Sequence, residues 1–204
     1  IPGKLENMLT HPESTVREQS NAIILSLSEV RRLTSLTNNM LTLAKSESNM
    51  TRIEKEPTNI ADFLSRILAP YQEMAEFDGK QVLLSAHVNQ PIYIDQKRIH
   101  QLIVLLVDNA MKYSEAGATV AIAASIEKRK FVLTVADTGR GISDEAKKHV
   151  FDRFYREDKT GSRETGGTGL GLSIAEWIVR AHGGKITVAD NQPKGTVFRI
   201  TLPL

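Results

Sequence analysis

The N-terminal part of the chain carries a helical pattern of hydrophobic positions. From residue 23 to residue 43, apolar side chains recur at intervals of three and four, which places them on one side of a helix. Residues 10–13 have the order of a helix start: a capping Thr, then a Pro in the first turn and a Glu. A helix over 13–46 would be about 50 Å long, more than a small domain can bury. We therefore expect residues 1–50 to form a helical hairpin that dimerises into a bundle; a single long helix lying on its own domain would give the same pattern.

The remainder of the chain alternates between helical and strand patterns. Residues 51–58 are polar and contain a proline, which is typical of a linker. Helices are expected at 60–76, 95–114 and 170–181, and strands at 81–88, 92–94, 119–125, 131–136, 185–190 and 196–202. The strands at 119–125 and 131–136 are expected to pair antiparallel. Helices interleaved with mainly antiparallel strands predict an α+β fold, in which residues 59–204 form a two-layer α/β sandwich.

Composition removes several classes of protein. The chain has no Cys, so disulfide scaffolds, zinc-thiolate sites and iron-sulfur clusters are excluded. Lys and Arg total 26 against 24 Asp and Glu, and because the two signs are interleaved we expect no nucleic-acid partner. No apolar run approaches the roughly 18 residues that span a bilayer, so we expect no membrane contact by this chain.

A first polar cluster, residues 108–114, closes the apolar helix expected at 95–114. Asn109 and Lys112 are three residues apart and therefore lie on neighbouring positions of one helix side. There the amide oxygen can bind a hard cation and the ammonium can bind a phosphate. An ordinary polar C-terminal turn, in which the helix dipole favours Lys112, would use the same residues.

A second cluster, residues 137–142, follows a predicted strand. It combines the carboxylate of Asp137 with glycines that let the backbone approach a ligand, an arrangement that suits recognition of a purine amino group. A plain turn would also use these residues. In a third cluster, residues 150–156, aromatic side chains alternate with Arg153 and Arg156, whose guanidinium groups can bind phosphate oxygens as a fork. A surface helix whose Phe side chains dock on the core would give the same pattern.

A fourth cluster, residues 166–172, is rich in glycine and opens into the helix expected at 170–181. Backbone N–H groups at a helix N-terminus favour an anion such as a triphosphate. The loop is not a Walker A motif, because no Gly-Lys-Ser/Thr closes it. It also follows no strand that would open a dinucleotide-binding unit.

Taken in order, the segments 95–114, 137–142, 150–156 and 166–172 resemble the N box, first glycine box, F box and second glycine box of sensor histidine kinases. Residues 33–46 are similar to the second helix of their dimerisation and phosphotransfer hairpin. Residues 181–186 and 194–198 match the closing segments of the family. The resemblance implies a Bergerat-type ATP-binding sandwich with a mobile lid over 156–166, and ATP and Mg²⁺ as cofactors.

The same resemblance assigns residue roles. Lys112, Arg153 and Arg156 would be catalytic and would face the phosphates, Asn109 would coordinate Mg²⁺, and Asp137 would bind the adenine amino group. The other residues implied to contact the nucleotide are Tyr113, Gly139, Gly141, Ile142, Phe154, Tyr155, Gly167, Thr168, Gly169, Leu170, Gly171 and Leu172.

The resemblance also implies a reaction and partners. The γ-phosphoryl group of Mg-ATP would pass to a His on the hairpin and then to an Asp of a response regulator, in a homodimer whose parent protein is in the cell membrane and whose catalytic part is cytoplasmic. The family's phosphoacceptor box is absent here, and residues 1–9 are similar to the part just after it. We therefore expect the acceptor upstream of this chain, because none of its five histidines fits that box: His11, His87, His100, His149 and His182.

One departure from the family pattern bears on rival functions. The usual N box has an Asn four residues before Asn109, and here that position is Leu105. Bergerat-type ATPases of the gyrase, mismatch-repair or heat-shock chaperone kind place a general-base Glu there. Because a leucine cannot take a proton, we expect slow or absent hydrolysis. Two further rivals are a protein-serine kinase with the same ATP fold and a nucleotide-responsive dimerisation module without activity.

Overall fold

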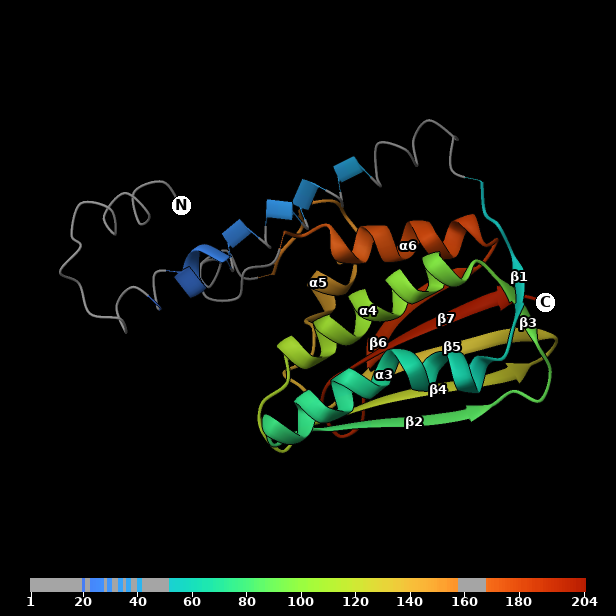
Figure 1. The fold of residues 1–204 in the computed structure, drawn as a ribbon, viewed down its shortest axis with the longest axis horizontal. Coiled ribbons are helices and arrows are strands. Elements are labelled where there is room, and N and C mark those ends of the chain that lie inside the picture. Colours follow the sequence, from blue (N-terminus) through green and yellow to red (C-terminus); the bar gives the residue numbers. More distant parts are fainter. Residues whose placement is uncertain are drawn as a thin grey trace.

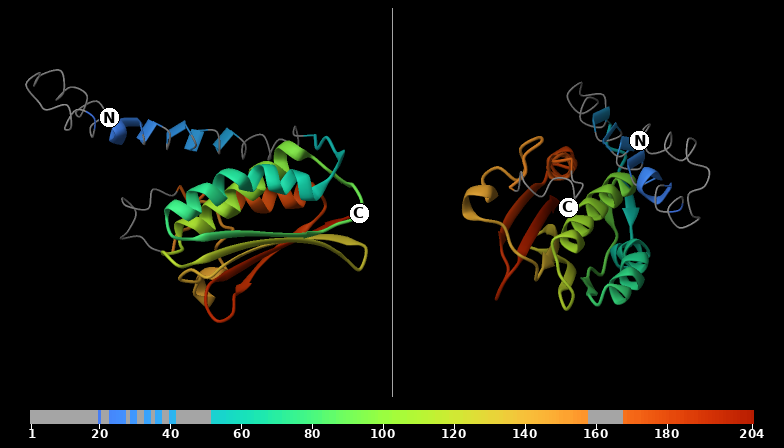
Figure 2. Two further views of the ribbon diagram at one scale, coloured as in Figure 1. Left: turned by 60° about the horizontal axis from the view of Figure 1, so that its bottom comes forward. Right: turned by 90° about the vertical axis from the view of Figure 1, so that its left-hand side faces the viewer.

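The computed structural model describes residues 52–157 and 168–204, together with scattered helical positions between 20 and 41. Those N-terminal positions are helical, as expected, and lie beyond the helix layer of the domain on the side away from the large sheet (Figure 2). Leu27, Val30 and Leu33 of the predicted stripe are 50%, 47% and 45% exposed in the single chain. The predicted hairpin partner helix falls outside the described residues, so dimerisation stays a prediction.

Five strands form the large sheet, in the order β2-β4-β5-β7-β6 (Figure 1). Their bounds are Gln81–His87 for β2, Thr119–Glu127 for β4, Lys130–Asp137 for β5, Lys185–Asp190 for β6 and Thr196–Pro203 for β7. The predicted antiparallel pair is β4–β5, and every other pairing in this sheet is antiparallel except β2–β4, which is parallel. A two-stranded sheet joins β1 (Glu56–Thr58) to β3 (Ile92–Ile94).

The helices lie on one face of the large sheet. They are α3 (Ile60–Phe77), α4 (Gln96–Lys112) and α6 (Gly171–Ala181), and a short α5 (Asp144–Lys147) follows β5. The strand β5 alternates as a half-covered strand should, because Phe131, Leu133 and Val135 are 1–2% exposed and lie in the core with α4. The predicted two-layer α/β sandwich is therefore confirmed.

Most predicted bounds agree with the structure to within two residues, and those of β3 and β6 agree fully. The differences are local. Residues 56–58, expected within the linker, form β1, which pairs with β3 and is fixed by a hydrogen bond from Gln96 Nε2 to the buried Thr58 hydroxyl (3.1 Å). The short helix α5 was not predicted; its Ser143 accepts the backbone N–H of Ala146 as an N-cap. No helix among the described residues is long and apolar enough to cross a membrane.

The two residues that join β4 to β5 offer a test of the fold. Glu127 pairs with Lys130, so Lys128 and Arg129 form the turn alone, and both have positive φ, 46° and 62°. Such turns favour Asn-Gly, because most other residues destabilise the fold by about 1 kcal/mol or more when their backbone is in the left-handed region. We expect the double substitution Lys128→Asn, Arg129→Gly to raise the free energy of unfolding by about 1 kcal/mol in urea titrations. An unchanged or lower value would show that the turn is not strained.

Candidate functional site

The helix α4 ends in a polar turn that faces an aromatic ring. Asn109 is half-buried and Lys112 is exposed, and both lie in the last turn, as predicted. Tyr113 caps the helix. The Lys112 ammonium lies 4.9 Å from the centroid of the Tyr113 ring, and the Arg140 guanidinium carbon lies 4.6 Å from it. Two cations are thus held beside one aromatic ring through cation–π contacts.

At the end of β5, the carboxylate of Asp137 is buried, with 5% of the residue exposed. Its Oδ1 accepts backbone N–H groups from Gly139 (2.9 Å) and Thr196 (3.3 Å). Burial raises the pKa of Asp137, and the two hydrogen bonds oppose that rise without cancelling it. Because both backbone donors bind Oδ1, the donor of a ligand would meet Oδ2.

Two glycines allow the approach of the loops around Asp137. A side chain at Gly139 would overlap the backbone oxygen of Tyr113, which accepts the N–H of Arg140 (3.2 Å). Gly195 has a φ of 114°, and a side chain there would overlap the backbone oxygen of Asp137. The first glycine box therefore lies directly against the end of α4, as recognition of one ligand by both segments requires.

The segment 150–156 lies in turns over 151–154 and is not the surface helix that the rival interpretation required. One part of that interpretation is correct, because Phe151 does pack on the core, with its ring edge-on to Phe198 (6.3 Å between centroids). Phe154 is 59% exposed and has a φ of 63°. Its N–H donates to the backbone oxygen of Gly169 (2.9 Å), where a side chain would come within 2.7 Å of the Phe154 backbone. The F box and the second glycine box are thus in contact.

The second glycine box leads into α6. Leu170 is fully buried, and it precedes α6 without a side chain that caps the first turn. The first N–H groups of α6 are therefore available to an anion. A Cβ added at Gly171 would lie 3.4 Å from Leu105 Cδ2, so the leucine that departs from the family pattern packs against this box. Gly166 and Gly167 lie outside the described residues.

The four predicted clusters are gathered at one end of the molecule, where α4 ends and α6 begins (Figure 1). Among the residues implied to bind nucleotide, Tyr155, Arg156, Thr168, Gly141, Ile142 and Leu172 are half-buried, and Arg153 is exposed. The prediction missed Thr196, which acts on Asp137 through its backbone, and Asn191, whose Nδ2 donates to the Asp137 backbone oxygen (2.8 Å). A backbone N–H is common to nearly all residue types, so the residue type could not identify Thr196 as a donor. The only indication of Thr196 in the sequence was the resemblance of residues 194–198 to a closing segment of the family.

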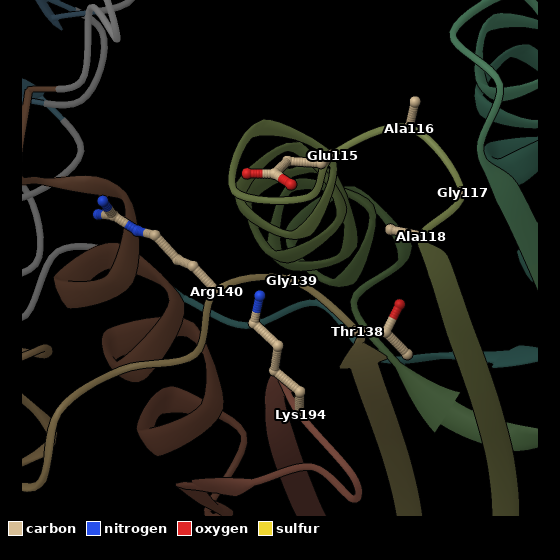
Figure 3. A pocket seen from close by; sticks show the side chains of 8 residues that line it. All are labelled: Glu115, Ala116, Gly117, Ala118, Thr138, Gly139, Arg140 and Lys194. Atoms are coloured by element: carbon tan, nitrogen blue, oxygen red, sulfur yellow. The ribbon is translucent and has the colours of Figure 1, made fainter.

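A cavity of about 230 Å³ lies beside the first glycine box (Figure 3). It is lined by Glu115, Ala116, Gly117, Ala118, Thr138, Gly139, Arg140 and Lys194. Lys194 lines the cavity from the β6–β7 loop, and Arg140 lines it from the loop that follows β5. The cavity shares Gly139 and Arg140 with the site but is not lined by Asn109 or Asp137, so we regard it as an adjoining space.

Within the described residues, no cluster of three or more His, Asp or Glu side chains could hold a metal ion. Asn109, half-buried in the last turn of α4, is the residue predicted to ligate a divalent cation through its amide oxygen. Mg²⁺ suits such a site, because it keeps waters and binds phosphate oxygens of its substrate. The donor set thus fits a metal that arrives with a nucleotide.

Residues 94–204 match the family described as "Histidine kinase-, DNA gyrase B-, and HSP90-like ATPase", which covers the segment from the end of β3 to the C-terminus. The chain belongs to this family of ATP-binding domains. The match takes in the helices α4 to α6 and the strands β4 to β7 of the sandwich described above.

Within this family, comparison with known proteins shows a resemblance to sensor histidine kinases. The chain is 37% identical over 205 residues to the sensor protein CiaH of Streptococcus pneumoniae; the match takes in all of this chain and 46% of that protein. It is also similar to the structure of full-length ShkA in complex with AMPPNP, with a TM-score of 0.78 and 27% identity over 93% of this chain and 39% of the other. The structure of the histidine kinase ThkA in complex with the response regulator TrrA shares the fold, with a TM-score of 0.77, 21% identity and coverage of 99% and 56%. These matches confirm the resemblance to sensor histidine kinases, and the chain spans less than half of the curated relative.

Proposed function

We propose that this chain is the catalytic core of a dimeric sensor histidine kinase, which binds Mg-ATP and donates its γ-phosphoryl group to a histidine. The observation that carries the proposal is the buried carboxylate of Asp137, held at a strand end against the last turn of α4. A carboxylate in such a place has a desolvation cost that a ligand's N–H donor would offset. An adenine amino group is such a donor.

In the proposed complex, the adenine lies near Asp137 and Tyr113, and the polyphosphate lies between the start of α6 and the end of α4. The uncapped first turn of α6 supports this placement, since its N–H groups and dipole favour negative charge. Lys112, Arg153 and Arg156 add positive charge. Asn109 would coordinate Mg²⁺, which when bound would neutralise phosphate charge during transfer.

The proposed reaction breaks the bond between the γ-phosphorus and the oxygen bridging it to the β-phosphate, and forms a bond from that phosphorus to an imidazole nitrogen. ADP leaves with the bridging oxygen. In a second step, the phosphorus–nitrogen bond breaks and an Asp carboxylate of a response regulator receives the phosphoryl group. The contribution of this chain is to orient the nucleotide and to stabilise charge, which is how most enzymes catalyse phosphoryl transfer.

The partners in this proposal are a second copy of the chain and a response regulator. The exposed apolar positions of the N-terminal helix support the dimer, because a stripe of this kind is stabilised by another helix. We propose residues 1–50 as the dimerising hairpin and 59–204 as the ATP-binding domain, within a longer protein that is anchored in the cell membrane and faces the cytoplasm. No nucleic acid takes part.

Asp137→Asn tests the proposed adenine contact. The amide keeps an oxygen for the N–H groups of Gly139 and Thr196, so the fold should persist, but it no longer offers a carboxylate to the nucleotide. We expect ATP affinity in titrations to fall at least about tenfold, which is roughly 1.4 kcal/mol. Asp62→Asn, in the exposed first turn of α3, is the matched control and should bind as the unaltered chain does. Equal affinities for both variants would remove Asp137 from the site.

Leu105 separates the proposed kinase from a Bergerat-type ATPase. No general base stands at this position, and the leucine side chain packs beside Gly171. We expect pure chain to release phosphate from Mg-ATP at well under roughly one turnover per minute in a steady-state assay. Sustained release of several phosphates per minute would favour the ATPase.

A further inference from the structure

A buried histidine lies at the end of the domain remote from the candidate site. His182 follows the last turn of α6 and is 2% exposed. Its Nδ1 lies 2.8 Å from the backbone oxygen of Ile178, and its Nε2 lies 3.2 Å from the backbone nitrogen of Asp95. Because a carbonyl oxygen can only accept, Nδ1 carries the proton; because a backbone N–H can only donate, Nε2 accepts. The two contacts therefore require a neutral imidazole in one tautomer.

Asp95 joins this histidine to two other segments. One carboxylate oxygen, Oδ1, caps α4 by accepting the N–H of Arg98 (3.0 Å). The other, Oδ2, accepts the N–H of Glu54 (3.3 Å), in the segment that precedes β1. The end of α6, the start of α4 and the segment before β1 thus meet at one residue, Asp95, through its backbone N–H and its carboxylate.

The charges around His182 act in opposite directions. Burial is the largest effect and lowers the pKa of His182; the Lys55 ammonium, from the segment before β1, lowers it further, while the Asp95 carboxylate at the start of α4 raises it. A proton on Nε2 would point at the N–H of Asp95, so that two donors would face each other. Protonation therefore removes the bond that holds Asp95.

We propose that His182 is a positioning residue, whose neutral imidazole fixes the start of α4 and, through Asp95, the segment by which the N-terminal helix enters the ATP-binding domain. α4 and α6 lie antiparallel, so the joint formed by Asp95 and His182 is at the opposite end of this helix pair from Asn109 and Gly171 (Figure 1). An effect of the joint on nucleotide binding rests on the proposed function. The joint itself does not.

The direction of the pH effect follows from linkage. The pKa of His182 is lower in the folded chain than the ordinary value of 6.5, so the unfolded chain binds more protons below that pH. The contribution of His182 to stability is therefore complete above about pH 6.5 and is lost as the pH falls toward the folded pKa.

Two substitutions separate the roles of the ring nitrogens. His182→Gln places an amide oxygen near the position of Nε2, where it can accept the N–H of Asp95 and cannot be protonated in this pH range. His182→Asn places an amide N–H near Nδ1, where it can donate to Ile178, but leaves Asp95 without an acceptor. The pair thus tests the contact to Asp95 against the contact to α6.

The measurement is the hydrogen-exchange protection factor of the amides of Glu54, Asp95 and Arg98 at pH 7.5 and 5.5, without nucleotide. We expect protection in the unaltered chain to fall about tenfold at the lower pH, to stay constant in His182→Gln, and to be low at both pH values in His182→Asn. Should His182→Asn fail to fold, the comparison of the unaltered chain with His182→Gln decides. An equal fall with pH in these two, or full protection in folded His182→Asn, would overturn the proposal. Because no nucleotide is present, the outcome does not depend on whether the chain is a kinase.

Discussion

A buried carboxylate must be compensated by hydrogen bonds, and the arrangement of this domain around Asp137 follows from that constraint. The backbone N–H of Gly139 comes from the loop after β5 and that of Thr196 from the first residue of β7, and the approach of both requires that Gly139 and Gly195 carry no side chain. The same approach brings Arg140 to Tyr113. The carboxylate therefore joins the loop after β5 to the start of β7, and the hydrogen bond from Arg140 to Tyr113 joins that loop to the end of α4.

The antiparallel packing of α4 and α6 on the sheet places the candidate site and the proposed joint at opposite ends of one helix pair. At one end, Leu105 lies beside Gly171 and the polar turn of α4 faces the uncapped start of α6. At the other end, Asp95 and His182 close the same pair of helices.

Local periodicity was sufficient for most of the fold, because each covered strand alternates and each helix has one apolar side. It could not predict the parallel pairing of β2 with β4, since register and direction depend on contacts between distant segments. It also placed residues 56–58 in a linker, because two polar residues, one on either side of a proline, have no strand pattern, and they form a strand only by pairing with β3.

The candidate site was predictable where side chains carry the chemistry and less so where the backbone does. The residue types alone made Asp137, Lys112 and the glycine boxes candidates for the site. The structure brings the segments that contain them together. Thr196 contributes only its backbone N–H to Asp137, and every residue except proline has this group, so the residue type gives no indication of the contact. His182 was not expected to accept a phosphoryl group, and its contact with Asp95, 87 positions away, could not be predicted from the local pattern.

The central claim is that the ATP site of this chain serves phosphoryl transfer to histidine. In the most direct test, γ-labelled Mg-ATP is added separately to this chain and to a chain that is extended upstream through the complete hairpin, and the label on each protein is measured. We predict that only the extended chain gains label, that the label is lost in acid and kept in base, as a phosphoramidate requires, and that Asp137→Asn in the extended chain lowers the labelling at subsaturating ATP. Accumulation of free phosphate with neither chain labelled would contradict the account and make the domain an ATPase.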